Sequence, residues 1–100
     1  MRPDLITSRR VFATVLTQAV ERAKALQALD PTWSLSAEIL RQLDLVGSVI
    51  RSRRIPTAQE KSSIDLGPLA VRNLDDSDDE FSTLLKEIYF HFKHYEELPP

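Results

Sequence analysis

Two histidines near the end of the chain are the side chains best suited to acid–base or metal chemistry. His91 and His94 are three residues apart, so on a helix they occupy neighbouring surface positions. A zinc site needs further ligands, and the sequence has no cysteine, no third histidine and no carboxylate at the spacing of a zinc-binding helix. No nucleophile and base stand in a recognisable motif either. We therefore expect no metal, no cofactor and no enzymatic activity. We also expect both histidines to be exposed or half-buried.

A run of acidic residues at positions 75–80 has the composition of a cation-binding loop. It lacks the glycine turn and the later bidentate glutamate of a calcium loop. Ser77 and Glu80 instead have the spacing of a helix capping box, and carboxylates are stabilised near the amino end of a helix. The run is therefore predicted to begin a helix. Four of its carboxylates are also candidates for contact with a partner protein: Asp75, Asp76, Asp78 and Asp79.

Aromatic side chains crowd the helix that this acidic run is predicted to begin. A helix in so small a protein cannot bury all of its sides, so one or two of these rings should reach the surface. Exposed aromatic residues often anchor protein interfaces. Phe92 and Tyr95 are expected to complete the core, and Tyr89 and Phe90 are the candidates for partner contact.

The spacing of apolar residues predicts the elements that position these side chains. With 42% hydrophobic and 28% charged residues, the 100-residue chain has the composition of one soluble domain over residues 1–100. Apolar residues recur at three- and four-residue steps, and no segment alternates as a strand would. The prediction is an all-α fold, a small helical bundle of three longer helices plus one or two short ones. The ends, about 1–7 and 97–100, are expected to be flexible.

Helices are predicted at about 8–29, 34–53 and 77–96, with short helices after Thr57 and at Gly67-Pro68. The inner faces of the first two helices should carry Phe12, Val15, Leu16, Ala19, Ala23, Leu26 and Leu29, and then Leu35, Ile39, Leu43, Val46 and Ile50. The short helix at Gly67-Pro68 should bury Leu69, Val71 and Leu74. The inner face of the last helix should carry Phe81, Leu84, Leu85, Ile88, Phe92 and Tyr95. Thr7 or Ser8 is expected to cap the first helix, and Thr57 with Glu60 to form a capping box. Gly47 indicates close contact with a neighbouring helix or a tolerated defect.

The charge is unevenly distributed along the chain. Residues 1–54 hold nine Arg/Lys and five Asp/Glu, a net charge of +4, whereas residues 55–100 hold four and ten, a net charge of −6. Nucleic-acid binding would use the basic set Arg9, Arg10, Arg51, Arg53 and Arg54, but the acidic half would repel phosphates. The uneven charge distribution instead favours a charge-matched protein partner. We expect no nucleic-acid binding. The lack of cysteine, signal peptide and membrane span predicts a cytoplasmic protein that does not bind membranes.

Residues 66–89 combine a Leu-Gly-x-x-Ala-Val-basic segment, an acidic capping turn and an amphipathic helix that ends in aromatic residues. In this pattern the chain resembles a small family of bacterial immunity proteins. In that family each protein neutralises the cytosolic toxin domain of a type VI secretion effector, the best-known toxin being an NAD(P)⁺ glycohydrolase. The resemblance implies an antitoxin that binds one cognate effector toxin domain, such as an NAD(P)⁺-degrading one, and occludes its active site.

A competing interpretation is a small helical adaptor or regulatory protein. In that case the aromatic last helix would pair with its own copy, and the free protein would be a homodimer. An immunity gene should lie beside a toxin gene, whereas a homodimer should be visible in the solution mass of the free protein.

Overall fold

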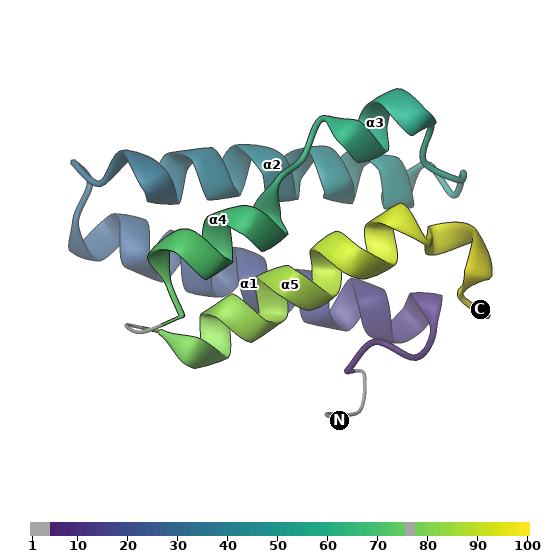
Figure 1. The fold of residues 1–100 in the computed structure, drawn as a ribbon, viewed down its shortest axis with the longest axis horizontal. Coiled ribbons are helices and arrows are strands. Elements are labelled where there is room, and N and C mark those ends of the chain that lie inside the picture. Colours follow the sequence, from purple (N-terminus) through teal and green to yellow (C-terminus); the bar gives the residue numbers. More distant parts are fainter. Residues whose placement is uncertain (1–4, 76–77) are drawn as a thin grey trace.

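The computed structural model describes residues 5–75 and 78–100, and these residues contain helices and no strand (Figure 1). The elements in chain order are α1 (Arg9–Leu29), α2 (Ser34–Arg51), α3 (Ala58–Ser62), α4 (Leu66–Asn73), α5 (Asp79–Lys93) and one turn of 3₁₀ helix, η1 (Tyr95–Glu97). The predicted all-α bundle of three longer and two short helices is confirmed.

The three longer helices form the body of the molecule. α1 and α2 run side by side in opposite directions, α5 packs on α1, and α4 packs on α5 (Figure 1). The beginning of α1, the end of α2 and the end of the chain therefore meet at one end of the bundle, and the turn before α5 lies at the other. The arginine-rich segments of the first half and the acidic turn of the second half are thereby separated in space.

Local side-chain hydrogen bonds set the helix starts. The Ser8 hydroxyl accepts the N–H of Val11, so Ser8 is the predicted cap of α1. Thr57 and Glu60 form the predicted capping box at α3, with both reciprocal bonds present. α5 begins at Asp79 and is capped by Asp78, whereas Ser77, the predicted cap, lies outside the described residues. Short-range chemistry therefore accounts for these three helix starts.

One continuous apolar core joins the helices. Phe12, Phe81 and Phe92 are its largest fully buried side chains, and Tyr95 meets Phe12 edge to face at 5.4 Å between ring centroids. Most of the predicted inner-face residues lie in this core. Together with smaller side chains from α2 and α4, these rings fill the space between the helices and fix how the helices pack.

Two residues predicted to face inward are exposed. Leu29, at the last turn of α1, is 81% exposed because the chain turns away at Asp30 and no helix covers that turn. Val71 is 56% exposed because the buried side of α4 is formed by Leu66, Ala70 and the following Leu74. The prediction for α1 was right about the buried face but not about where its cover ends, whereas the prediction of Val71 as an inner-face residue of α4 was wrong.

Gln42 is a buried polar residue that the apolar pattern of α2 did not predict. Its amide nitrogen donates to the carboxylates of Glu38 at 2.7 Å and Asp65 at 2.6 Å. Its amide oxygen accepts the backbone N–H of Asp65 at 2.8 Å. The Gln42 side chain thus links α2 to Asp65, the residue that precedes α4. It accepts the Asp65 backbone N–H, which a leucine side chain at position 42 could not do.

The end of the chain packs against the beginning of α1. The backbone N–H of Arg9 donates to the carbonyl of Pro99 at 2.8 Å, which satisfies one of the free amides of the first helical turn. The Arg9 guanidinium lies 4.8 Å from the centroid of the Tyr95 ring. Ile6 and Leu98 are both buried, so the segments on either side of the helical body add to its core.

Candidate partner-binding surface

The acidic turn before α5 is partly neutralised within the molecule. The Asp75 carboxylate forms an ion pair with Lys86 at 2.7 Å and accepts the hydroxyl of Ser82 at 2.5 Å. These hydrogen bonds, first that from Lys86 and then that from Ser82, lower the pKa of Asp75. Asp76 lies outside the described residues. Asp75 therefore has a structural role in holding the turn against α5.

Asp78 is also occupied within the fold. One of its oxygens caps α5 by accepting the N–H of Phe81 at 3.2 Å, and the other accepts two hydrogen bonds from Arg22 of α1, at 2.6 and 3.1 Å. Asp79 is exposed in the first turn of α5, beside the exposed Glu80. Of the predicted acidic contacts, Asp79 is the one that the described structure leaves most open to a partner.

A shallow groove of about 560 Å³ lies between α1 and the start of α5. The Arg22–Asp78 ion pair crosses this groove. Its remaining lining residues are Gln18, Glu21, Glu80, Phe81 and Leu84. Leu84 was predicted to be an inner-face residue, and it is half-buried at this groove.

Tyr89 is held against α4. A Cβ atom built on Gly67 would lie 2.6 Å from Cδ2 of the Tyr89 ring, which shows that the ring rests directly on the glycine. The ammonium of Lys93 lies 4.9 Å from the centroid of the same ring. The predicted partner residue Tyr89 is therefore half-buried, and much of its surface is used in packing α4 on α5.

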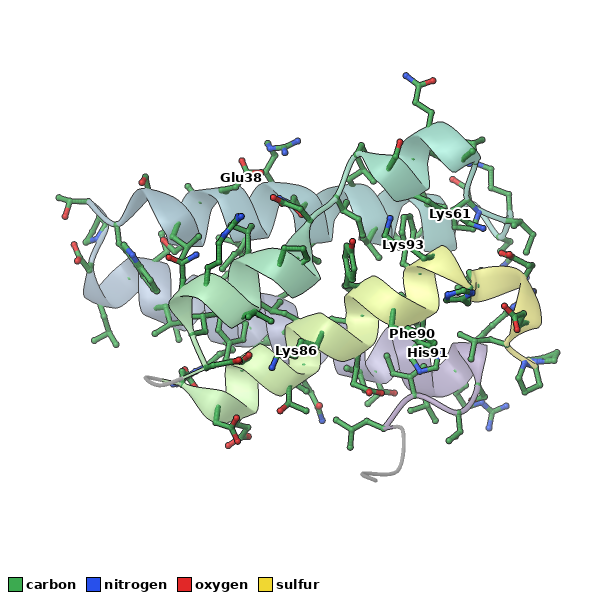
Figure 2. The ribbon with its side chains drawn as sticks, in the orientation of Figure 1. Glu38, Lys61, Lys86, Phe90, His91 and Lys93 are labelled. Atoms are coloured by element: carbon green, nitrogen blue, oxygen red, sulfur yellow. The ribbon has the colours of Figure 1, made fainter. Side chains whose placement is uncertain are left out.

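Phe90 is the predicted partner residue that projects into solvent. Its side chain is 52% exposed, although it lies on α5 between the buried residues Ile88 and His91 (Figure 2). The ring packs on two histidines, at 5.0 Å between centroids for His91 and 4.6 Å for His94. A hollow of about 320 Å³ opens beside it, lined also by Glu97 and Leu98.

The two histidines have different surroundings. His91 is buried, in contrast to the prediction, because Phe90 covers one side of its ring and the Glu87 carboxylate lies 3.7 Å from Nε2. That carboxylate also accepts the N–H groups of Leu5 and Ile6, which brings the N-terminal segment over this part of α5. His94 is exposed, and its Nδ1 lies 3.0 Å from a Glu97 oxygen.

No group of three or more His, Cys, Asp or Glu side chains that could hold a metal occurs within residues 5–75 and 78–100. In the same part of the chain, no helix is long and apolar enough to cross a membrane.

The arginines considered for nucleic-acid binding do not form one free patch. Arg54 makes a bidentate ion pair with Glu60, at 2.6 and 2.7 Å, and this pair raises the pKa of the arginine. Arg9 stacks on Tyr95. Arg53 follows α2 with a positive φ of 56°, and its backbone N–H donates to the carbonyl of Ile50 at 3.1 Å in the turn that ends the helix. Two of these five cations are thus used to hold the same end of the bundle together.

Sequence comparison identifies the family. The family model named Tsi6 matches residues 12–94, which run from the first turn of α1 to the end of α5. No curated protein and no solved structure matches the chain. The match extends well beyond the segment 66–89, on which the resemblance in the sequence was based, and it covers most of the chain. The chain therefore belongs to the Tsi6 family of type VI secretion immunity proteins.

Proposed function

We propose that this protein is the antitoxin for one type VI effector, and that it binds the toxin domain of that effector in the cytoplasm and covers its substrate cleft. The observation that carries the proposal is the family match over residues 12–94. The protein itself carries out no reaction. The effector's toxin is proposed to degrade NAD(P)⁺, as the resemblance of residues 66–89 implies.

The arrangement of the surface supports a role in binding. The apolar side chains of α1, α2 and α5 are largely committed to one core, so the molecule presents a rigid, pre-formed exterior. A rigid surface loses little conformational entropy when it binds, which favours a tight and long-lived complex. A tight complex is what an antitoxin requires, because a single free toxin molecule continues to turn over its substrate.

The first experiment is to co-express this protein with the toxin domain encoded beside its gene. The proposal predicts that the two proteins co-purify as a stable complex, and that cells arrested by the toxin grow when this chain is present. Cellular NAD⁺ should fall with the toxin alone and stay at its normal level with both proteins. An unrelated small helical protein expressed at the same level serves as the control.

Two results contradict the proposal in different ways. Absence of both complex and rescue refutes the immunity function for that toxin. Rescue and complex formation without any effect of the toxin on NAD⁺ supports immunity and refutes the NAD(P)⁺-degrading assignment. A free protein with the mass of a dimer, together with no complex, would favour the homodimeric adaptor.

Charge steering by the acidic turn can be tested separately. Asp79→Lys should slow association with the toxin domain, because Asp79 is exposed in a half of the chain with a net charge of −6. Asp44→Lys is the matched control, since Asp44 is also exposed but lies on α2. Equal association rates for the two variants at low ionic strength would exclude Asp79 from the interface.

A further inference from the structure

The hollow beside Phe90 has the shape and chemistry of a binding subsite. It is formed where α5 passes into η1, and its lining consists of Phe90, His91, His94, Glu97 and Leu98. We call it the Phe90 hollow. Its volume of about 320 Å³ suits a single long side chain, and the open mouth makes it accessible to a partner surface.

The ring of Phe90 is oriented before any partner arrives. His91 meets it edge-on, with an interplanar angle of 86°, and His94 lies against it at 40°. His91 is itself buried, so it forms a fixed support. An exposed aromatic ring normally loses rotamer freedom on binding, and a ring already held by two neighbours loses less. Phe90 therefore has the features of an interface anchor.

The charge around the hollow favours a cationic occupant. Among the five lining residues the one carboxylate is Glu97, whose side chain is 70% exposed, and none is Lys or Arg. Nδ1 of His94 lies 3.0 Å from Oε2 of Glu97, so this contact holds the carboxylate close to the Phe90 ring and becomes an ion pair when His94 is protonated. An aromatic face next to a carboxylate binds a guanidinium or ammonium group through cation–π and charge-assisted contacts. The buried Leu98 offers apolar surface for the aliphatic stem.

We propose that the Phe90 hollow receives an arginine or lysine side chain of the effector's toxin domain. This inference rests on the proposed immunity function. It specifies which surface of the protein contacts the toxin domain and which kind of side chain of the toxin domain that surface receives. It places the interface on the second half of α5, at a distance along the helix from the acidic turn (Figure 2). Asp75 and Asp78 in that turn are paired with the cations Lys86 and Arg22, whereas the partner of Glu97 is a histidine, which is charged only when it is protonated.

The test measures affinity for the purified toxin domain that is encoded beside this gene. Phe90→Ala should weaken binding by about tenfold or more, as expected for an aromatic anchor. Phe90→Leu keeps an apolar side chain but removes the π-face, and it should still weaken binding by about fivefold. Glu97→Gln should weaken binding by about fivefold and reduce the dependence of affinity on salt.

Matched controls separate the surface from general effects. Val71→Ala removes an apolar side chain of similar exposure from α4, and Asp44→Asn removes an exposed carboxylate from α2. Both should bind as the wild type does. Thermal unfolding of every variant verifies the fold, and Glu97, as a largely exposed residue, provides a test that does not depend on replacing an aromatic ring.

Each outcome has one meaning. If the wild-type protein does not bind the toxin domain, the proposed function fails. If the wild type binds and the Phe90 and Glu97 variants bind within twofold of it, the function stands and the hollow is not the interface. Loss of binding in Phe90→Ala but not in Phe90→Leu or Glu97→Gln means an apolar occupant and overturns the cationic one. A wild-type dimer that Phe90→Ala converts to a monomer assigns the hollow to a second copy and also overturns the proposal.

Discussion

The two glycines of this protein lie in helices, yet replacing them by alanine should change stability in opposite directions. Neither has a positive φ, so alanine is compatible with the backbone at both positions. A Cβ on Gly67 would lie 2.6 Å from Cδ2 of Tyr89, a distance that requires the ring to move. A Cβ on Gly47 would meet Leu16 at an ordinary 3.7 Å, and at 3.0 Å the guanidinium end of Arg51, which can rotate away.

The expected magnitudes follow from two opposing effects. Alanine in a helix is favoured over glycine by about 1 kcal/mol, whereas overpacking a filled site is unfavourable by about 1–3 kcal/mol. Gly47→Ala gains helix propensity without overpacking the site, so it should stabilise the protein by about 0.5–1 kcal/mol. Gly67→Ala gains the same helix propensity but overpacks the site against Tyr89, so the net effect should be a loss of stability of about 1 kcal/mol. In a domain of this size, 1 kcal/mol corresponds to a Tm difference of about 4–8 °C.

Urea unfolding followed by helical circular dichroism measures both effects, and a double-mutant cycle identifies their cause. In a Tyr89→Ala background, Gly67→Ala has no ring to displace and should become neutral or stabilising. Equal stabilisation of the wild type by both glycine replacements would refute the close contact between Gly67 and Tyr89. A Gly67→Ala penalty that persists without the Tyr89 ring would refute the explanation by overpacking.

Three further predictions concern polar contacts. Hydrogen bonds, first of all from Arg54, lower the pKa of Glu60 from 4.5 to about 2, so the stability that ionised Glu60 contributes is lost as pH falls through that window. Glu60→Gln should therefore flatten the pH dependence of unfolding between pH 4.5 and 2, and an unchanged profile would contradict this. Gln42→Leu leaves the part-buried N–H of Asp65 without its acceptor and should reduce the free energy of unfolding by about 1 kcal/mol, measured in urea. Asp78→Ala should destabilise by about 1 kcal/mol through loss of the α5 cap, whereas Asp78→Asn keeps a capping oxygen and should have a smaller effect on Tm.

The features that the sequence predicted well depend on neighbours in the chain. Ser8 caps α1 and Thr57 with Glu60 caps α3, because each bond joins residues three positions apart. The short helix predicted at Gly67-Pro68 is α4, which begins one residue earlier at Leu66 and holds Pro68 in its first turn, where proline is tolerated. Of the two alternatives for Gly47, close helix contact or a tolerated defect, the ordinary 3.7 Å distance from an added Cβ to Leu16 favours the tolerated defect.

The candidate surface was predicted only in part, because exposure depends on residues far away in the sequence. Phe90 and Tyr89 are adjacent aromatic residues on one helix, and no local rule distinguishes them. Gly67, 22 positions before Tyr89, provides the flat surface on which that ring packs, whereas Phe90 packs only on the nearby His91 and His94 of its own segment within the described residues and stays 52% exposed. Arg22, 56 positions before Asp78, determines that Asp78 is paired.

The amino-acid sequence alone therefore determined the all-helical class, the caps of α1 and α3 and the charge asymmetry between the two halves. These follow from periodicity, capping chemistry and composition, which act over a few residues or are simple sums. The tertiary structure decided which side of each helix is covered, which acidic residues are neutralised and which aromatic ring remains in solvent. Those outcomes require elements distant in sequence to come within a few ångströms, and the packing of the whole chain determines which of them meet.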